Sequence, residues 1–371
     1  MVIKLIDDSQ DILNLLKKLS DSIGVSGYED NIRQLVIEEL KDYSDSIEID
    51  SLGNVIATKK GSKSSKKIML AAHMDEIGLI INYIDEKGFL RFSPIGGVSE
   101  RTLMAQRVKV ISGNKAFKGV IGLKPPHIMK PEEAKQVPDF SDLYIDVGMF
   151  SRDEVLNSGI NIGSLVVIDR ELEVIGNKGI VTGKSLDDRA GLTTMIDSFK
   201  KISDNELSVV AVATVQEEVG LKGAKVSSFS VEPDVAIALD VTIASDVPPV
   251  QEQNWICKLN QGPAIKLIDG QKGTGLISDP RLVNFAVNLA KKYSIPYQLE
   301  VLPGGTTDAS AINLNKEGVP SITISIPSRY VHSSVEVVSL NDIANASRLV
   351  QKIVTEIDDN YINSILKKKI K

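Results

Sequence analysis

An all-β stretch interrupts a pattern of alternating strands and helices, and this interruption constrains the fold of the chain more than any other feature. Between about residues 78 and 177, short apolar runs follow one another with turn residues between them, and a helical pattern appears only near residues 152–157. Such a run of short strands is typical of a small barrel or sandwich. On both sides of it, apolar runs alternate with amphipathic segments, which predicts a sheet covered by helices on both faces.

The chain length of 371 residues also favours two domains. We therefore predict an α/β fold in which residues 1–77 and 178–371 form one domain, with an all-β, barrel-like domain inserted at residues 78–177. A hairpin is predicted over residues 46–59, around a Gly-Asn turn. The expected helices lie at 9–22, 30–43, 187–202, 280–293, 308–316 and 340–359, and the expected buried strands at 68–72, 207–215, 235–239, 297–301 and 321–326.

Composition excludes several classes of protein. The chain has 43 Lys and Arg against 49 Asp and Glu, a net charge of −6, and so lacks the basic face of a nucleic-acid binder. Its single cysteine, Cys257, excludes an internal disulfide and fits a reducing compartment. No window approaches the roughly 18 apolar residues of a membrane helix, and charged residues break up residues 1–20, unlike a secretory signal. We predict a cytoplasmic protein that binds neither membranes nor nucleic acid.

Acidic residues and histidines recur where apolar runs end, the edge at which open α/β sheets bind ligands. His73 follows the run 68–72, and Asp75 lies two residues further on, where a carboxylate could orient a metal-bound imidazole. Taken singly, each group also has an ordinary structural interpretation, such as a helix cap or the polar start of a loop. The remaining groups are Asp187 and Asp188, Glu217 and Glu218, Asp240, and His332.

Together these groups predict a metal site. Imidazole and carboxylate ligands without cysteine suit catalytic zinc, cobalt or manganese. Apart from Asp75, seven such groups exceed the needs of one ion, so two ions that share a carboxylate are the economical interpretation. Other interpretations are a glycosidase that uses two carboxylates, a two-metal deacylase or amidohydrolase, and a non-enzymatic protein with the β insertion as an interaction module. A glycine turn at residues 303–308 opens a helix and could present N–H groups to an anion or a carbonyl.

The order of these motifs resembles that of the tetrahedral (TET) dinuclear metallo-aminopeptidases. This family includes glutamyl, leucyl and deblocking enzymes, and some members carry an endoglucanase label. The resemblance covers nearly the whole chain, with one departure, an additional threonine at residues 304–308 where Gly-Gly-Thr-Asp is usual. It is carried by His73-Met74-Asp75-Glu76, Leu186-Asp187-Asp188-Arg189, Gln216-Glu217-Glu218-Val219-Gly220, Asp240 and His332-Ser333, together with Ser26-Gly27-Tyr28-Glu29, Lys124-Pro125-Pro126-His127, Gly304-Gly305-Thr306 and Arg329-Tyr330.

The resemblance implies a ligand set for two divalent ions. His73, Asp187 and Asp240 would hold one ion. Asp187, Glu218 and His332 would hold the other, so that Asp187 is the bridge. The implied fold is the sandwiched mixed sheet of the dinuclear metallo-aminopeptidases, with the inserted β barrel as a dimerisation domain.

The resemblance also implies roles for residues that hold no metal. Asp75 would orient His73, Glu217 would be the general base, and the Asp187–Asp188 peptide bond would be cis. The implied substrate contacts, which lie in the glycine turn and near the second histidine, are Gly305, Thr306, Asp308 and Arg329.

The implied function is that of an aminopeptidase that removes N-terminal residues from short peptides. A hydroxide bridging two zinc or cobalt ions, or manganese as an alternative, would attack the peptide, and Glu217 would carry the proton to the leaving amine. The remaining alternatives are a deacylase or amidohydrolase on the same site and an endoglucanase. The implied partners are short peptides and copies of the chain, which would form dimers and a dodecamer. Acidic, basic and hydrophobic preferences occur in the family, so the preference stays open.

Overall fold

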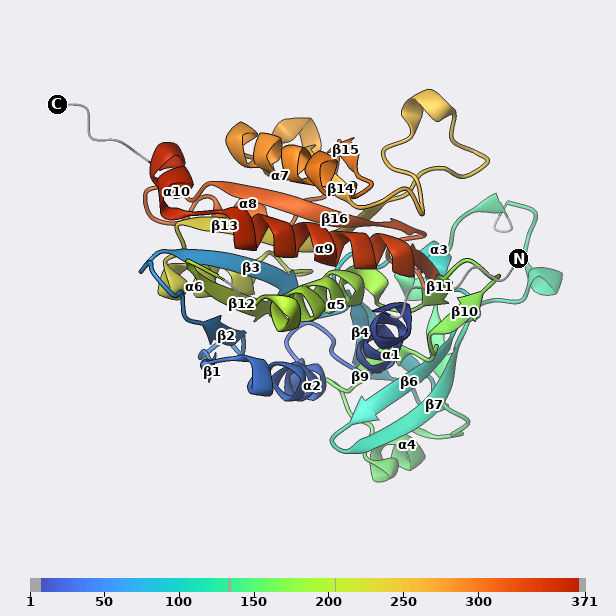
Figure 1. The fold of residues 1–371 in the computed structure, drawn as a ribbon. Coiled ribbons are helices and arrows are strands. Elements are labelled where there is room, and N and C mark those ends of the chain that lie inside the picture. The colour runs from blue at the N-terminus through green and yellow to red at the C-terminus, as the bar shows by residue number, and fades with distance from the viewer. Residues whose placement is uncertain (1–7, 133–134, 204, 367–371) are drawn as a thin grey trace.

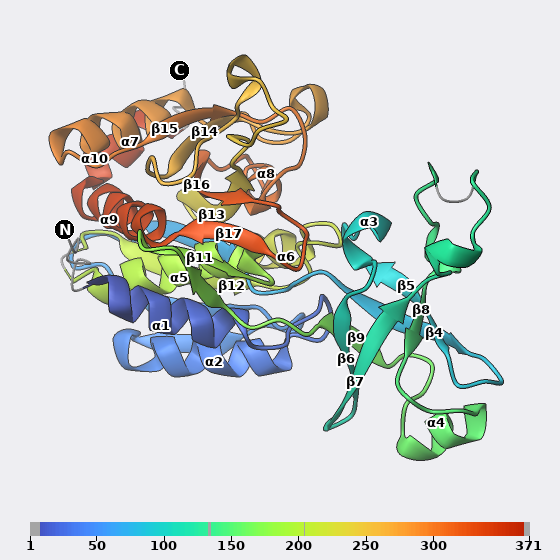
Figure 2. The same cartoon turned by 90° about the vertical axis from the view of Figure 1, so that its right-hand side faces the viewer.

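The computed structural model describes residues 8–132, 135–203 and 205–366. They form a larger α/β domain and a barrel that stands beside it (Figure 1). Figure 2 shows the barrel to the right of the larger domain, joined to it near one end of the central sheet. No helix among the described residues is long and apolar enough to cross a membrane.

A mixed sheet of eleven strands forms the centre of the larger domain. Four neighbouring strands at its centre run parallel, whereas the pairs towards both ends are antiparallel. The mixed α/β class predicted from the sequence is therefore confirmed. The strands follow one another in space as β1 (Ser46–Ile49), β2 (Val55–Lys59), β12 (Ser208–Thr214), β3 (Lys67–His73), β13 (Val235–Ile243), β16 (Ser321–Arg329), β17 (Glu336–Ser339), β11 (Ile180–Gly183) and β10 (Glu173–Ile175), with β14 (Ala264–Ile268) on β16 and β15 (Gln298–Val301) on β14.

Helices cover both faces of this sheet. They are α1 (Asp8–Ser20), α2 (Asp30–Leu40), α5 (Leu186–Lys201), α6 (Lys222–Val231), α7 (Pro280–Lys292), α8 (Asp308–Ile312), α9 (Leu340–Glu356) and α10 (Asp359–Ile365). Along β3, Ile68, Leu70 and Ala72 pack in the core with α1, α2, α5 and α9, whereas Met69 and Ala71 pack with α6 and α8. Because both faces are buried, the strand reads as an unbroken apolar run.

The inserted segment closes into a six-stranded antiparallel barrel with its own core. Its strands run in the order β4 (Gly78–Ile84), β5 (Leu90–Ile95), β8 (Tyr144–Asp146), β7 (Lys115–Gly122), β6 (Arg107–Ser112) and β9 (Leu165–Ile168). Two short helices, α3 (Glu100–Leu103) and α4 (Arg152–Ser158), accompany them. Closure leaves no free sheet edge, which lets so small an all-β unit bury its apolar side chains.

Several elements differ from the sequence prediction. The helix expected at 340–359 stops at Glu356, and a second helix, α10, begins at Asp359, where Asp358 accepts the N–H of Tyr361 as a cap. The helix expected at 308–316 ends at Ile312, and α6 was not predicted. A Cβ atom on Gly223 of α6 would collide with the Asn54 amide oxygen and with the backbone of Val215, the residue after β12. Close packing against β12 therefore requires a glycine there, although glycine weakens a helical pattern.

Candidate metal centre

Parallel strands bring two of the predicted ligands to one edge of the sheet. His73 is the last residue of β3. Ala238 of β13 pairs with Ala71 of β3, so Asp240 lies level with His73 on the neighbouring strand. Because the carboxyl ends of parallel strands share an edge, residues 167 positions apart in the chain converge here.

His73, Asp187 and Asp240 form a first group. The Nε2 atom of His73 lies 3.1 Å from Oδ1 of Asp187 and 4.0 Å from Oδ1 of Asp240. One donor atom from each residue lies within 4.8 Å of the other two. His73 is 2% exposed and Asp240 6%, so the group is nearly closed to solvent.

Asp187, Glu218 and His332 form a second group. The Nε2 atom of His332 lies 3.3 Å from Oδ2 of Asp187 and 3.2 Å from Oε1 of Glu218. These three donors also lie within 4.8 Å of one another. Asp187 therefore presents one carboxylate oxygen to each group, which is the arrangement expected of a bridging ligand.

The start of α5 explains how Asp187 is free to face both groups. Neither Asp187 nor Asp188 has helical dihedral angles, and the peptide bond between them is cis, as expected from the resemblance. Oδ1 of Asp188 accepts the N–H of Gly191 at 2.9 Å and caps the helix. Asp188 therefore caps the helix, and the Asp187 carboxylate can face both metal groups.

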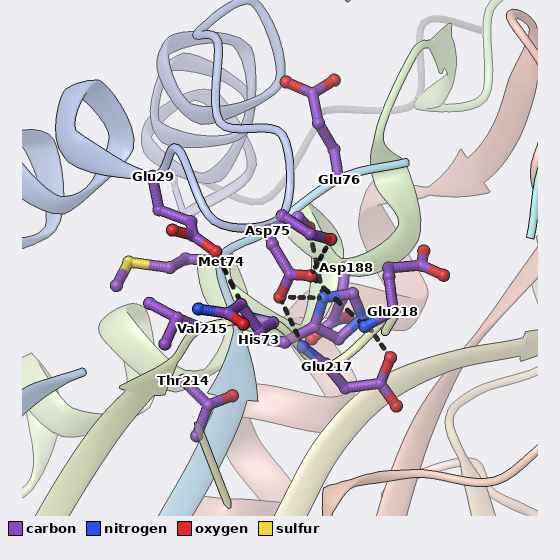
Figure 3. Close-up of polar contacts among 12 residues, drawn as sticks. Glu29, His73, Met74, Asp75, Glu76, Asp188, Thr214, Val215, Glu217 and Glu218 are labelled. Carbon is purple, nitrogen blue, oxygen red and sulfur yellow. Dashed lines mark hydrogen bonds and ion pairs between the residues drawn. The ribbon is translucent and has the colours of Figure 1, made fainter. Parts of the chain in front are cut away.

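Asp75 holds His73, Glu217 and Glu218 in place. Its Oδ1 accepts the backbone N–H of Glu217 at 2.9 Å, and its Oδ2 accepts that of Glu218 at 3.2 Å and the hydroxyl of Ser26 at 2.5 Å. The Nδ1 atom of His73 lies 3.2 Å from the Asp75 carbonyl oxygen and 3.5 Å from Oδ1. Figure 3 shows Asp75 between His73 and the backbone of Glu217. Asp75 thus positions a histidine and both glutamates.

Glu217 lies beside His73, close to the first group. Its Oε2 is 4.0 Å from Nε2 of His73, and its side chain is 11% exposed. Burial raises the pKa of Glu217 well above the usual range, and the negative charge of Asp240 adds to this effect. A carboxyl group with a raised pKa at the wall of a cavity is suited to proton transfer.

Negative charge exceeds positive charge in this cluster. Burial opposes protonation of His73, but the charge of Glu217 and the contact with Asp187 outweigh it and raise its pKa well above 6.5. The same competition between burial and the acids raises the pKa of His332 to about 12. Oε1 of Glu218 is buried, and Nε2 of His332 lies 3.2 Å from it. Divalent cations compensate such an excess of buried carboxylates.

The residues present fit divalent metal ions. Carboxylate and imidazole donors without cysteine suit zinc, cobalt or manganese. Bonds of about 2.0–2.2 Å place the donors of a tetrahedral site roughly 3.3–3.5 Å apart. The closest histidine–carboxylate pairs, at 3.1, 3.2 and 3.3 Å, are near this separation.

Both groups open onto a cavity of about 770 Å³. Gly305 and Thr306 lie in its wall, as predicted for substrate contacts. The other two predicted contacts do not line it. Asp308 is 3% exposed and accepts the hydroxyl of Thr214 at 2.5 Å, and Arg329 pairs with Asp246 at 2.7 Å. The third histidine, His127, is exposed in a short 3-10 helix of the barrel and belongs to neither group.

Sequence reasoning missed Glu336. Its Oε2 accepts the backbone N–H of Asp187 at 3.0 Å, and its Oε1 accepts that of His332 at 2.7 Å. The one signal in the sequence is an acidic residue within an apolar strand, four positions after His332. It also missed the carbonyl oxygen of Gly97, which lies 2.9 Å from Nδ1 of His332. Because every residue has a backbone carbonyl, the residue type does not reveal such a contact.

Comparison with known proteins identifies the family. The model of the M42 glutamyl aminopeptidase family matches residues 53–349. A lysyl aminopeptidase from Pyrococcus furiosus is 41% identical over 92% of this chain and 96% of its own length. An aminopeptidase structure from the archaeon Desulfurococcus kamchatkensis superposes with a TM-score of 0.95 at 50% identity, covering 98% of this chain and all of that one.

A third comparison agrees with the TET resemblance. The Pyrococcus horikoshii TET1 peptidase, described as assembling into a tetrahedron or a large octahedral shell, gives a TM-score of 0.83 at 35% identity, covering 93% of this chain and all of that one. Sequence motifs, the family model and these structures all point to a peptidase and against a glycosidase. The chain belongs to the M42 glutamyl aminopeptidase family of peptidase hydrolases.

Proposed function

We propose that this aminopeptidase removes N-terminal residues from short peptides with two divalent metal ions, zinc or cobalt, with manganese as the alternative. His73, Asp187 and Asp240 would hold one ion, and Asp187, Glu218 and His332 the other. The observation that carries the proposal is the shared carboxylate, because Asp187 presents one oxygen to each group at the wall of the cavity.

The side chains of the chain supply positioning and proton transfer. When bound, the ions provide Lewis-acid chemistry, which polarises the scissile carbonyl and lowers the pKa of water. Glu217 takes the proton of the attacking water and returns it to the leaving amine. The nearly buried carboxylate of Glu217, beside His73 at the cavity wall, can carry that proton between the two steps. Asp75 fixes Glu217 through its backbone N–H.

A free N-terminus would be preferred because a neutral α-amino group would offer a donor nitrogen to one of the two ions, which a blocked N-terminus would not. Anchoring there would place the first peptide bond next to Glu217. Gly305 and Thr306 would contact the peptide from the opposite wall. Asp308 and Arg329, which were predicted as direct contacts, would act through Thr214 and Asp246.

Glu217→Gln tests the base assignment. We expect the variant to keep both ions but to lose about 10²–10⁴-fold in kcat, because only proton transfer is removed. Metal content is measured by mass spectrometry and turnover with aminoacyl-nitroanilides. The control is Asp342→Asn, because Asp342 is a buried carboxylate of the same domain that touches neither group. Retained activity in Glu217→Gln would remove Glu217 from the role of base.

A substrate panel separates the proposal from the alternatives. After chelation, adding back zinc, cobalt or manganese should restore cleavage of peptides with a free N-terminus. The N-acetylated forms of the same peptides and carboxymethylcellulose should stay intact. Release of acetate instead would identify a deacylase, and sugar release would identify an endoglucanase.

We also propose that the barrel is the dimerisation domain and that six dimers form a dodecamer. Three apolar side chains of the barrel, Ile128, Phe150 and Ile162, are 67%, 86% and 69% exposed. Apolar groups exposed to this extent favour a covered surface. Light scattering measures the mass directly, and a monomer at micromolar concentration would refute the assembly. The cytoplasmic location stays a prediction.

A further inference from the structure

Glu336 connects two residues of the second group through their backbones. Oε2 accepts the N–H of Asp187 at 3.0 Å and Oε1 accepts the N–H of His332 at 2.7 Å, so each oxygen has its own donor. The side chain is 2% exposed. Two hydrogen bonds from one buried side chain, shielded from water, hold their partners firmly.

The two residues held by Glu336 need an external constraint. His332 has a φ of +60°, a conformation that a residue with a side chain rarely adopts. Asp187 precedes the regular part of α5 and has non-helical angles. His332 lies in a loop, and Asp187 precedes the regular turns of α5. His73 and Asp240, in contrast, lie within strands. Such conformations persist only where surrounding contacts determine them.

The position of Glu336 is itself well fixed. It is the first residue of β17 and pairs with Gly183 of β11. The following residue, Val337, pairs with Arg329 of β16. The carboxylate therefore projects from a strand that is paired with β11 and β16. Its hydrogen bond to the His332 N–H can thus restrict the movement of the loop that carries His332.

The barrel adds a second constraint on His332. Its Nδ1 lies 2.9 Å from the carbonyl oxygen of Gly97, which directs Nε2 towards Asp187 and Glu218. A metal-bound histidine commonly donates its other ring N–H to such an acceptor. The backbone N–H and the ring of His332 are thus held from two directions, by Glu336 and by Gly97.

We propose that Glu336 is a positioning residue for the second metal ion, acting with the carbonyl of Gly97 to place Asp187 and His332. Glu336 itself touches neither substrate nor metal. The inference rests on the proposed function, because it assumes that the second group holds an ion. It distinguishes the two ions by degree, since Glu336 would place two ligands of the second ion, Asp187 and His332, but only the shared Asp187 of the first, whose other ligands lie on β3 and β13.

A matched residue distinguishes positioning from general stability. Asp342 is 1% exposed, and its two oxygens accept the N–H groups of Asn260 and Gly262, both at 2.7 Å. The contacts of Asp342 match those of Glu336 in number, kind and burial. However, neither N–H donor, Asn260 or Gly262, belongs to the metal groups. Asp342→Asn therefore reports what losing such a carboxylate costs in stability alone.

The experiment compares Glu336→Gln with Asp342→Asn in the full chain. Gln keeps the size of the side chain but turns one acceptor into an NH₂ group, which faces a backbone N–H. Cobalt is titrated into the metal-free proteins, with a competing chelator and the cobalt absorption bands as readouts. We expect the second ion to bind about 10–100-fold more weakly to Glu336→Gln and the first ion, of whose ligands Glu336 places only Asp187, to weaken by a smaller factor.

Each result decides a separate question. If Glu336→Gln binds the second ion as tightly as the parent protein, or loses both ions equally, the inference is wrong. An equal loss in Asp342→Asn would also overturn it. If Glu336→Gln does not fold, the same titration of Glu336→Asp decides, because Asp keeps the charge but is too short to reach both N–H groups. A parent protein that binds fewer than two ions would instead refute the proposed function.

Discussion

The two metal groups are built in different ways although they share Asp187. His73 and Asp240 lie on adjacent parallel strands and are 2% and 6% exposed. Glu218 and His332 lie in loops, and the His332 side chain is 33% exposed. Strand pairing places the first group, whereas single contacts from Asp75, Glu336 and Gly97 place the second.

One site thus combines a rigid half, His73 and Asp240 on strands, with an adjustable half, Glu218 and His332 in loops. A sheet buried on both faces resists local movement, because moving one strand breaks its hydrogen bonds to both neighbours. A loop residue moves when one contact is lost. We therefore expect the second group to bind its ion more weakly and to respond more strongly to distant substitutions.

The largest effect should come from the residue common to both groups. Asp187→Ala removes one ligand from each, so we expect less than one ion per chain and a loss of activity of about 10³-fold or more. Metal analysis after dialysis and nitroanilide hydrolysis measure these quantities. Two fully occupied sites in this variant would refute the assignment of Asp187 as the bridging ligand and, with it, the division into two groups.

Removing one histidine from each group compares the two halves directly. His73→Ala leaves a hole and unpaired carboxylates in the core, so we expect the metal-free protein to lose about 2–4 kcal/mol of unfolding free energy. His332→Ala should cost less than His73→Ala, because the His332 side chain is one-third exposed. Denaturant unfolding after chelation measures both values. Equal costs would contradict the distinction between a rigid and an adjustable half.

A glycine in the barrel tests how far the adjustable half extends. A Cβ atom on Gly97 would meet Nδ1 of His332 at 2.7 Å. We expect Gly97→Ala to weaken binding of the second ion about 10-fold while the first is unchanged. Gly113→Ala is the control, because a Cβ there meets nothing within 4 Å, although its φ of +57° costs some stability. Competition with a chelator measures both ions, and an unchanged second affinity in Gly97→Ala would show that the barrel does not constrain His332.

The smallest effect concerns pH. In the metal-free protein the surrounding acids raise the pKa of His332 from 6.5 to about 12. A raised histidine pKa stabilises the fold fully below pH 6.5, and this contribution is lost as the pH rises towards 12. We expect the metal-free Tm to fall by a few degrees between pH 6.5 and 9, and His332→Gln to reduce that fall. If the slope is the same in His332→Gln, the acids around His332 do not couple to stability.

Much of this architecture was predictable from local patterns. The apolar run 68–72 required a strand buried on both faces, and the series of short strands after it required a separate β unit. Helix α6 was not predictable, since Gly223 is required by packing against β12 rather than by local propensity. Asp358 divides the last helical pattern through a cap that depends on a single hydrogen bond.

The candidate site divides in the same way. Residue type and position after apolar strands pointed to His73, Asp187, Glu217, Glu218, Asp240 and His332, and the structure brings all six together. The family resemblance implied substrate contacts for Asp308 and Arg329, whereas these side chains contact Thr214 and Asp246 and do not line the cavity. Their partners lie 94 and 83 residues away, so no local pattern could reveal them.

The sequence by itself determined the α/β class, the β insertion, the family and the chemistry of the donors, because periodicity and residue type are local properties. Only the tertiary structure decided which oxygen of Asp187 faces which histidine, and that Glu336 and the Gly97 carbonyl hold His332. These contacts join segments up to 235 residues apart and partly use backbone atoms. Backbone atoms are common to all residues, so their roles become visible only when the chain is folded.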